Sequence, residues 1–417
     1  MREQTCKENA NSLEMSYSHN DIVMARLTPA GTAAIGVIGL AGQGASSLIA
    51  SCIRTAGQKH PLRILNTKLG EQHRLACSSG QKTVYVGWFD DGRQSDQVVV
   101  VSHPGRDREI VEIHCHGGPA VIEWIMRVLA TNGARPVEVQ DWLRLTIPNL
   151  IKRSVLAKLG QAATLKTAAI LLDQFHGAWE RCIGQIQSLL AERRWSELRA
   201  LVARLRDLIP AGKHLCRPFL IALAGAPNTG KSTLLNALLG YTRAITSPQP
   251  GTTRDVVSGE TAFDGWPVCL LDTAGFRDTT DPLEAAGIAK AIQTCKQADL
   301  VLWLLDVSAP PILPPPELTN CLLVLSKIDL QPAWQADDVL AVRKGHVAVS
   351  AKTRTGLDKL ICTILHNLLP QVPKPGEAVP FTDTLCAKIE HLHEVSDRCH
   401  WERVSVLSSQ LHDPDSD

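Results

Sequence analysis

The sequence predicts a multidomain protein in which an α+β block, an all-helical block and an α/β block follow one another. The first 130 residues combine β-branched stretches with glycine turns, and no proline occurs between Pro148 and Pro210. From about residue 217 to residue 369, short apolar runs alternate with helical patterns. Alternation of this last kind is typical of a mainly parallel sheet.

Length and composition agree with a folded chain. At roughly 150 residues per domain, a chain of 417 residues corresponds to two or three domains. The hydrophobic fraction of 44% and the charged fraction of 20% exclude a disordered chain. The net charge of +1 gives no global electrostatic footprint for nucleic acid or an anionic membrane, so any RNA contact must be local.

No export signal is visible. Residues 1–7 lack an apolar signal-peptide core, and apolar runs such as 300–305 are too short to span a bilayer. The 12 cysteines never form a Cys-x-x-Cys pair, which argues against a disulfide framework or a zinc ribbon. We therefore expect reduced thiols, no membrane span and a cytoplasmic location.

Four segments are expected. The N-terminal α+β domain covers residues 1–130, with strand candidates at 22–23, 34–40, 84–88, 97–102 and 109–115. A helical domain begins over 131–216, and its last helix is expected to end at 210–212. An α/β domain follows over 217–370. Beyond a proline-rich linker, residues 371–417 form a short C-terminal helical part with an acidic tail.

Residues 225–232 carry the strongest chemical signal, since they fit G-x-x-x-x-G-K-[ST] in full, between an apolar strand and a helix. Backbone amides and the helix N-terminus favour phosphate in such a loop. Lys231 would reach the β- and γ-phosphates, and the Ser232 hydroxyl suits Mg²⁺. This context disfavours the alternative of a chance glycine turn.

Further motifs follow at strand ends, where ligands bind in such sheets. Residues 251–255 would be a switch loop, Asp272 would hold Mg²⁺ through water, and the Gly275 amide would meet the γ-phosphate. Asp329 can accept two hydrogen bonds from guanine, which adenine cannot supply, and residues 350–352 would back the base. The order predicts a GTPase. The residues expected to contact GTP are Asn228, Thr229, Gly230, Lys231, Ser232, Thr233, Ser247, Thr252, Thr253, Asp272, Thr273, Ala274, Gly275, Ser326, Lys327, Asp329, Ser350, Ala351 and Lys352.

Two positions depart from the usual GTPase pattern. Ser326 stands where most GTPases have Asn or Thr, so guanine affinity is weakened or the serine keeps enough of the loop's hydrogen bonds. Phe276 stands where a glutamine orients water in Ras-like proteins. Glu284 is a candidate replacement, although the residues alone favour a first-turn helix carboxylate there. A monovalent cation at Asn228 could replace an arginine finger.

This order of motifs resembles the MnmE (TrmE) family of tRNA modification GTPases over roughly residues 20–390. The matching stretches are 21–42, 112–119 (Glu-Ile-His-Cys-His-Gly-Gly-Pro), 227–228, 251–255 and 272–288. The resemblance implies a tetrahydrofolate-binding-like α+β domain, then an all-α domain into which a Ras-like P-loop G domain is inserted.

The same resemblance implies roles for individual residues. K⁺ would be held by Asn228, Ser247, Gln249 and Thr252, and Mg²⁺ by Ser232 and Thr253, while Glu284 would orient the attacking water. The family pairs its G domains in a homodimer. With the FAD-dependent partner MnmG (GidA), it modifies C5 of the tRNA wobble uridine, using a one-carbon unit from folate.

The N-terminal and C-terminal parts depart from the family. Gly39 replaces an arginine that contacts folate, residues 137–144 replace Gly-Glu-Phe-Thr-x-Arg-Ala-Phe, and the chain ends in Asp-Ser-Asp rather than Cys-Ile-Gly-Lys. Glu112 is the one folate contact that carries over. The departures leave a second hypothesis, a GTPase switch that acts through a protein partner without modifying tRNA. A ribosome-assembly GTPase is a third, which the folate-domain signature disfavours.

For two remaining clusters a structural role is favoured over a functional one. His114 and His116 flank Cys115 on one strand face, and a packing or pocket role is favoured over a metal site because no further ligands are evident. Five arginines lie among acidic residues on one helix, so a solvated face is favoured over RNA binding. They are Arg193, Arg194, Arg199, Arg204 and Arg206.

Overall fold

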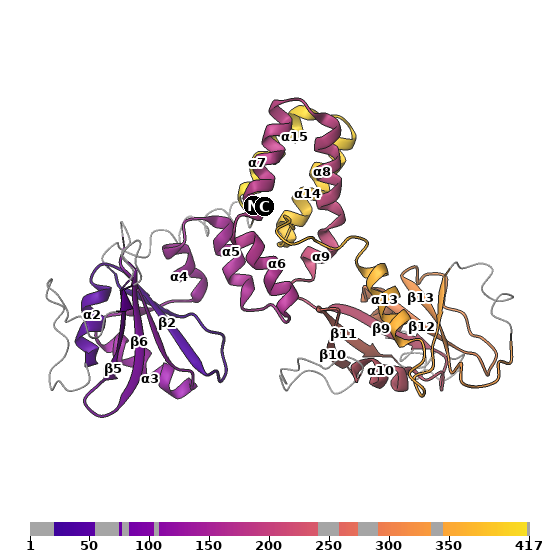
Figure 1. Cartoon of the computed structure of the whole chain (residues 1–417), viewed down its shortest axis with the longest axis horizontal. Helices are drawn as coiled ribbons and strands as arrows, with labels where there is room; N and C mark the ends of the chain where they lie inside the picture. The colour runs from indigo at the N-terminus through magenta and orange to yellow at the C-terminus, as the bar shows by residue number, and fades with distance from the viewer. Residues whose placement is uncertain are drawn as a thin grey trace, which may run out of the picture. The chain divides into compact units, whose positions relative to one another are not determined.

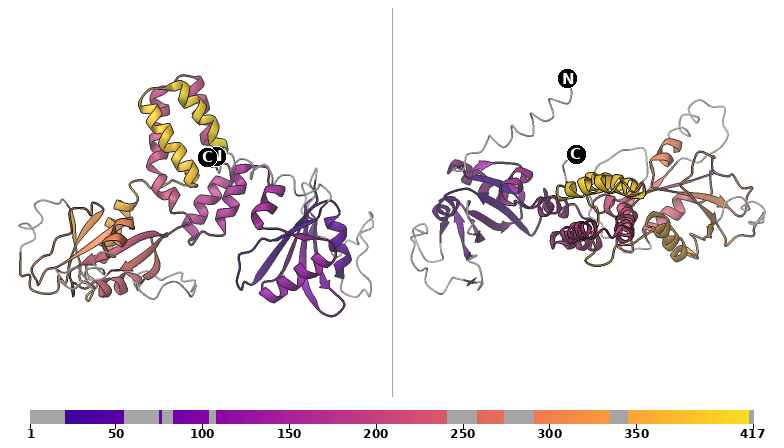
Figure 2. Two further views of the ribbon diagram at one scale, coloured as in Figure 1. Left: turned by 180° about the vertical axis from the view of Figure 1, so that it is seen from behind. Right: turned by 90° about the horizontal axis from the view of Figure 1, so that it is seen from above.

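The computed structural model describes residues 21–54, 75–76, 83–103, 108–240, 258–273, 291–334 and 345–414. The chain divides into two compact units, Met1–Asn149 and Leu150–Asp417 (Figures 1 and 2). The predicted mixture of an N-terminal α+β part, helices and an α/β part is confirmed. Among the described helices, none has both the length and the apolar character needed to cross a bilayer.

Unit 1 is built on one sheet with the strand order β3-β5-β6-β7-β2-β1-β8, and β4 pairs with β5. All pairs are antiparallel except β1 with β8. The strands are β1 (Val23–Arg26), β2 (Ile35–Ala41), β3 (Ile53–Arg54), β4 (Leu75–Ala76), β5 (Thr83–Asp90), β6 (Ser95–His103), β7 (Ile110–His116) and β8 (Arg135–Pro136). The helices are α2 (Ala45–Cys52), α3 (Pro119–Thr131) and α4 (Val139–Thr146).

The two faces of this sheet differ because side chains alternate along a strand. On β7, Val111, Ile113 and Cys115 enter a core that α2 and α3 complete. Glu112 and His114 therefore point to the other face, where α4 packs on β1 and β2.

Unit 2 begins with helices that are completed by the end of the chain. The first helices are α5 (Leu150–Leu159), α6 (Leu165–Phe175), α7 (Ala178–Ala191), α8 (Trp195–Asp207) and α9 (Ile209–Lys213). The C-terminal helices are α14 (Asp383–Asp397), α15 (Trp401–Ser409) and η2 (Gln410–His412). α14 packs on α8 and α15 packs on α7, so yellow and magenta helices lie side by side in Figure 1.

The expected helix end at residues 210–212 is wrong. These residues lie inside α9, which begins with Pro210 in its first turn. Proline is tolerated there because the first helical amides have no intrahelical partner.

The α/β part of unit 2 has six strands in the order β10-β11-β9-β12-β13-β14, parallel except for β10 with β11. The strands are β9 (Phe219–Gly225), β10 (Ser258–Phe263), β11 (Trp266–Asp272), β12 (Leu300–Asp306), β13 (Cys321–Ser326) and β14 (His346–Ala348). Helices α10 (Lys231–Leu239) and α13 (Leu357–Leu368) share one core with one sheet face. The helical residues 291–297 pack on the other face.

The helical part and the sheet of unit 2 share a continuous core that includes Leu215, Phe219 and Trp266. Polar contacts support it at the β10–β11 turn. Thr164 Oγ1 donates to the carbonyl oxygen of Gly265 at 2.6 Å, and Lys166 Nζ lies 2.7 Å from an Asp264 carboxylate oxygen. The sheet that presents the nucleotide motifs is therefore supported on a packed helical base.

Candidate functional site

The phosphate loop lies between the end of β9 and the start of α10. Its backbone needs two residues in the left-handed region, Asn228 with φ 63° and Gly230 with φ 93°. Gly225 has φ 137°, and a Cβ there would lie 2.6 Å from the carbonyl oxygen of Leu304 on β12. This glycine permits β9 to run close beside β12 just before the loop turns.

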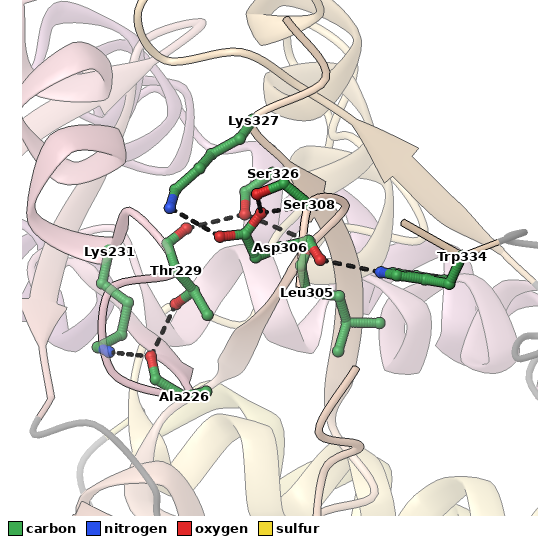
Figure 3. Close-up of polar contacts among 9 residues, drawn as sticks. All are labelled: Ala226, Thr229, Lys231, Leu305, Asp306, Ser308, Ser326, Lys327 and Trp334. Atoms are coloured by element: carbon green, nitrogen blue, oxygen red, sulfur yellow. Dashed lines mark hydrogen bonds and ion pairs between the residues drawn. The ribbon is translucent and has the colours of Figure 1, made fainter. Parts of the chain in front are cut away.

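The Lys231 ammonium folds back over the loop. Nζ donates to the carbonyl oxygen of Gly225 at 3.2 Å. It also donates to that of Ala226 at 2.8 Å, and Thr229 Oγ1 donates to the same Ala226 oxygen at 2.9 Å (Figure 3). Burial lowers the pKa of Lys231, while the charge of Asp272 opposes that shift. The cation is thus held in the loop, where it can meet phosphate oxygens.

A second polar corner joins α10 to the end of β11. Ser232 Oγ donates to Asp272 Oδ2 at 2.5 Å, and Thr273 is anchored through its N–H and hydroxyl to the carbonyl oxygen of Leu223. Asp272 Oδ1 is buried without a hydrogen-bond partner among the described residues. A buried carboxylate oxygen is costly to leave unpaired, and Mg²⁺ prefers oxygen ligands and bound water. Ser232 and Asp272 therefore fit a magnesium site.

Ser326 ties the end of β13 to the phosphate loop. Its buried hydroxyl contacts the carbonyl oxygens of Thr229 at 2.8 Å and Leu305 at 3.3 Å (Figure 3). A hydroxyl has one proton, so it serves these two acceptors by sharing, whereas an asparagine amide has two. The geometry fits the alternative in which the serine keeps a loop hydrogen bond.

Asp329 is oriented by the last loop of the sheet. Its Oδ1 accepts a hydrogen bond from Ser350 Oγ at 2.7 Å, and Ser350 Oγ accepts from the Thr353 N–H at 3.1 Å. The Ser350 hydrogen bond lowers the pKa of the exposed Asp329 carboxyl, so the group is an anion at neutral pH. An oriented carboxylate can accept from two adjacent N–H groups of a ligand.

Asp306 is a residue that the sequence analysis missed. At the end of β12 it accepts from Ser308 N–H at 2.9 Å and lies 2.7 Å from Lys327 Nζ, and its backbone oxygen accepts from Trp334 Nε1 (Figure 3). Burial raises the pKa of Asp306, but Lys327 and Ser308 together hold it below the ordinary value. Its position at a strand end was the available signal. Lys327 itself has a left-handed backbone, with φ 59°. The ion pair with Asp306 holds the Lys327 side chain beside Gly230.

These loops enclose a pocket of about 240 Å³. Its lining combines residues from the phosphate loop and α10, from the β13 loop and from the β14 loop. They are Thr229, Gly230, Thr233, Leu234, Ser326, Lys327, Asp329, Leu330, Val349, Ala351 and Lys352. Segments more than 100 residues apart in the sequence thus meet at the carboxyl edge of one sheet, as the motif order predicts.

Several expected site residues lie outside the described ranges. They are Ser247, Gln249, Thr252, Thr253, Ala274, Gly275, Phe276 and Glu284. Asn228 is described and exposed at the tip of the phosphate loop.

In unit 1, Glu112 lies between two histidines. Its Oε1 is 3.5 Å from His103 Nε2, and its Oε2 is 3.4 Å from His114 Nε2. His116 instead contacts Asp96 at 2.5 Å. In the part of the chain that the structure describes, no group of three His, Cys, Asp or Glu side chains could hold a metal ion.

Three of the five clustered arginines take part in ion pairs. Arg194 pairs with Glu192 and Glu197, Arg204 with Glu377, and Arg206 with Asp207. Most of this cluster's charge is therefore balanced locally.

Comparison with known proteins gives matches to both units. The family described as "GTP-binding protein TrmE N-terminus" matches residues 22–141, and "50S ribosome-binding GTPase" matches residues 220–332. A tRNA modification GTPase MnmE of Thermus thermophilus is 34% identical over 382 residues, which cover 84% of this chain and 83% of the relative. That of Chlamydia felis is 33% identical over 306 residues, covering 64% and 67%.

A solved structure, the G domain of the T. maritima FeoB iron transporter, is 25% identical and covers 36% of this chain and 99% of its own, with a TM-score of 0.29.

Proposed function

Because this chain belongs to the MnmE family of tRNA modification GTPases, and is a GTP hydrolase, we propose that it couples K⁺-dependent GTP hydrolysis to modification of C5 of the tRNA wobble uridine. The observation that carries the nucleotide part is the meeting of the phosphate loop, Ser326 to Asp329 and the β14 loop around one pocket. Asp329 faces this pocket as an oriented anion, which suits the N–H edge of guanine.

The phosphate end is proposed to bind Mg²⁺ and K⁺. Ser232 and Thr253 would hold Mg²⁺, which neutralises phosphate charge when bound. Asn228, Ser247, Gln249 and Thr252 would hold K⁺. The exposed side chain and left-handed backbone of Asn228 support a role for its amide oxygen at the loop tip. Glu284 would orient the attacking water.

The G domain is proposed to be an insertion in the helical domain, with boundaries at 131–216, 217–370 and 371–417 after an N-terminal domain of residues 1–130. The packing of α14 on α8 supports this arrangement, because α8 precedes the strands of the sheet in the sequence and α14 follows them. The proposed partners are a second copy through the G domains, the FAD-dependent MnmG and tRNA, in the cytoplasm.

Tetrahydrofolate does not fit the N-terminal unit in the way the family implies. The space beside residue 39, where the family has a folate-contacting arginine, is filled by Trp142. The same feature favours a second candidate function, a GTPase switch that acts through a protein partner.

The GTPase chemistry is tested by phosphate release in KCl and in NaCl at equal ionic strength, for the wild type and Glu284→Ala. We expect KCl to accelerate hydrolysis, and Glu284→Ala to bind a fluorescent GTP analogue normally while losing turnover. Glu402→Ala, an exposed glutamate in the first turn of α15, is the matched control. Equal rates in both salts would refute the Asn228 cation site, and normal turnover in Glu284→Ala would remove Glu284 from the mechanism.

The tRNA part is tested by mass spectrometry of tRNA nucleosides from cells with and without this gene. Loss of the C5-modified wobble uridine is the expected result. Unchanged tRNA in cells that hold no other copy of the family would favour the GTPase switch.

A further inference from the structure

Unit 1 contains a matched pair, Gly39 on β2 and Trp142 on α4. An ideal Cβ at residue 39 would lie 2.7 Å from both Cε2 and Cζ2 of the Trp142 indole, and 2.9 Å from Leu27 Cδ1. Real Cβ contacts are essentially never this short. No residue larger than glycine therefore fits while the indole is in place.

The backbone of Gly39 does not itself require glycine. Its φ is not positive. It pairs in regular register with Ala25 on β1 and with Glu112 on β7. Any residue could adopt this extended conformation. The demand for glycine therefore comes from the side chains that lie over residue 39, chiefly the Trp142 indole, since Leu27 Cδ1 is the far end of a flexible side chain.

Trp142 is fixed in this position by its own helix. The segment before α4 is hydrogen-bonded to β1, where the Val137 N–H donates to the Met24 carbonyl oxygen at 2.9 Å, and α4 packs on β1 and β2. The indole is 5% exposed. The ring edge that meets Gly39 contains Cε2, which is bonded to Nε1, and Nε1 has no hydrogen-bond partner among the described residues. The N–H is thus buried against the strand without an acceptor, a cost that the packing of the ring has to offset.

Glu112, the other position implied to contact folate, is directly opposite Gly39 in the β2–β7 register. Both of its carboxylate oxygens face imidazoles, those of His103 and His114. A ligand that approached Glu112 along this sheet face would contact the Trp142 ring, which lies over Gly39. It would find no positively charged side chain on β2, because that strand contains none.

We infer that Trp142 closes the folate site on this sheet face, and that the protein does not bind tetrahydrofolate. Gly39 and Trp142 act together, because the loss of the arginine side chain provides the space that the indole fills. The inference rests on membership of the family and concerns unit 1, so it is independent of the GTP pocket.

Binding is measured by equilibrium dialysis of the full chain against 5-formyltetrahydrofolate. We expect no saturable binding by the wild type at millimolar ligand. The double variant Gly39→Arg/Trp142→Ala removes the ring and restores a cation opposite Glu112. It is expected to bind with a Kd at least about tenfold below the highest concentration at which the wild type shows no binding. Trp124→Ala is the matched control, because that tryptophan lies on α3 against the core on the other sheet face.

Each outcome decides part of the inference. Saturable micromolar binding by the wild type overturns it. Absence of binding in both the wild type and a folded double variant supports the loss of folate binding but refutes Trp142 as its cause. GTP hydrolysis is measured on the same preparations, so that failure of the nucleotide chemistry is recognised separately. Binding by Trp124→Ala would show that loss of any tryptophan has the effect, and would also overturn the role of Trp142.

Discussion

Replacing Asp329 with asparagine should exchange guanine for xanthine in the nucleotide pocket. The carboxylate lines the pocket and accepts from Ser350 through Oδ1. Guanine offers two donors, N1–H and the N2 amino group, to such a carboxylate. Xanthine keeps N1–H but has a carbonyl oxygen in place of the amino group, which a carboxylate repels.

The structure sets the orientation of the new amide. Ser350 Oγ donates to Oδ1 and already accepts from the Thr353 N–H, so it favours an amide oxygen at the Oδ1 position. The amide nitrogen then takes the Oδ2 position, where it is a donor. It opposes the N2 amino group of guanine and matches the O2 carbonyl of xanthine.

The expected loss follows from the two hydrogen bonds to guanine. The bond from the N2 amino group, worth roughly 1.5–3 kcal/mol to a charged acceptor, is replaced by two opposed donors, and the N1–H bond now has an uncharged acceptor, so GTP binding weakens by about 10²- to 10³-fold. The assay is competition of GTP and XTP against a fluorescent nucleotide, followed by hydrolysis of each. Asp264→Asn is the control, since that carboxylate pairs with Lys166 in the β10–β11 turn and does not line the pocket.

A variant that kept wild-type preference for GTP over XTP would refute the reasoning, because the carboxylate would then not read the base. Equal loss of both nucleotides in a folded variant would instead place Asp329 in the structure of the loop.

Two further predictions concern ties between loops and helices. Ser326→Ala removes the donor to the Thr229 carbonyl oxygen. Because such a hydrogen bond is worth about 1 kcal/mol, GDP binding should weaken about fivefold. Unchanged affinity in a fluorescence titration would show that this hydrogen bond does not position the phosphate loop. Burial raises the pKa of Glu377, but hydrogen bonds from Arg204 and the Lys374 N–H hold it below the ordinary 4.5. The stabilisation of the folded protein by the Glu377 carboxylate is therefore complete above pH 4.5 and is lost as the pH falls through the lowered pKa. The difference in thermal unfolding temperature between the wild type and Glu377→Gln should shrink only below pH 4.5. A difference that stayed constant with pH would refute the ion pair.

The meeting of these loops around one pocket could be predicted from the sequence, because the information for each loop is local. The spacing around Lys231 and Ser232 specifies a strand, a loop and a helix, and the later motifs each follow a short apolar strand. The rule that ligands bind at the carboxyl ends of parallel strands then brings the pieces together. Asp306 obeys the same rule at the end of β12 and was missed, because no motif surrounds it.

Contacts between distant helices could not be predicted in this way. Amphipathic patterns show that α7, α8, α14 and α15 each bury one face, but not which helix covers which. The pairing depends on specific contacts such as the Trp179 Nε1–H, which donates to the Leu411 carbonyl oxygen at 3.0 Å. The Gly39–Trp142 pair has the same origin, since a glycine in a strand does not reveal what lies above it.

The chain enters and leaves the α/β part of unit 2 through two segments that touch. An ideal Cβ at Gly212 would lie only 1.9 Å from the Pro380 carbonyl oxygen, so the backbones of α9 and of the segment before α14 are in direct contact. The Gln174 side chain supports the same segment, donating to the Glu377 carbonyl oxygen and accepting from the Val379 N–H. The C-terminal helices are therefore part of the base on which the sheet stands, although they are short. Both crossings between the helical part and the sheet are therefore fastened to the helical core.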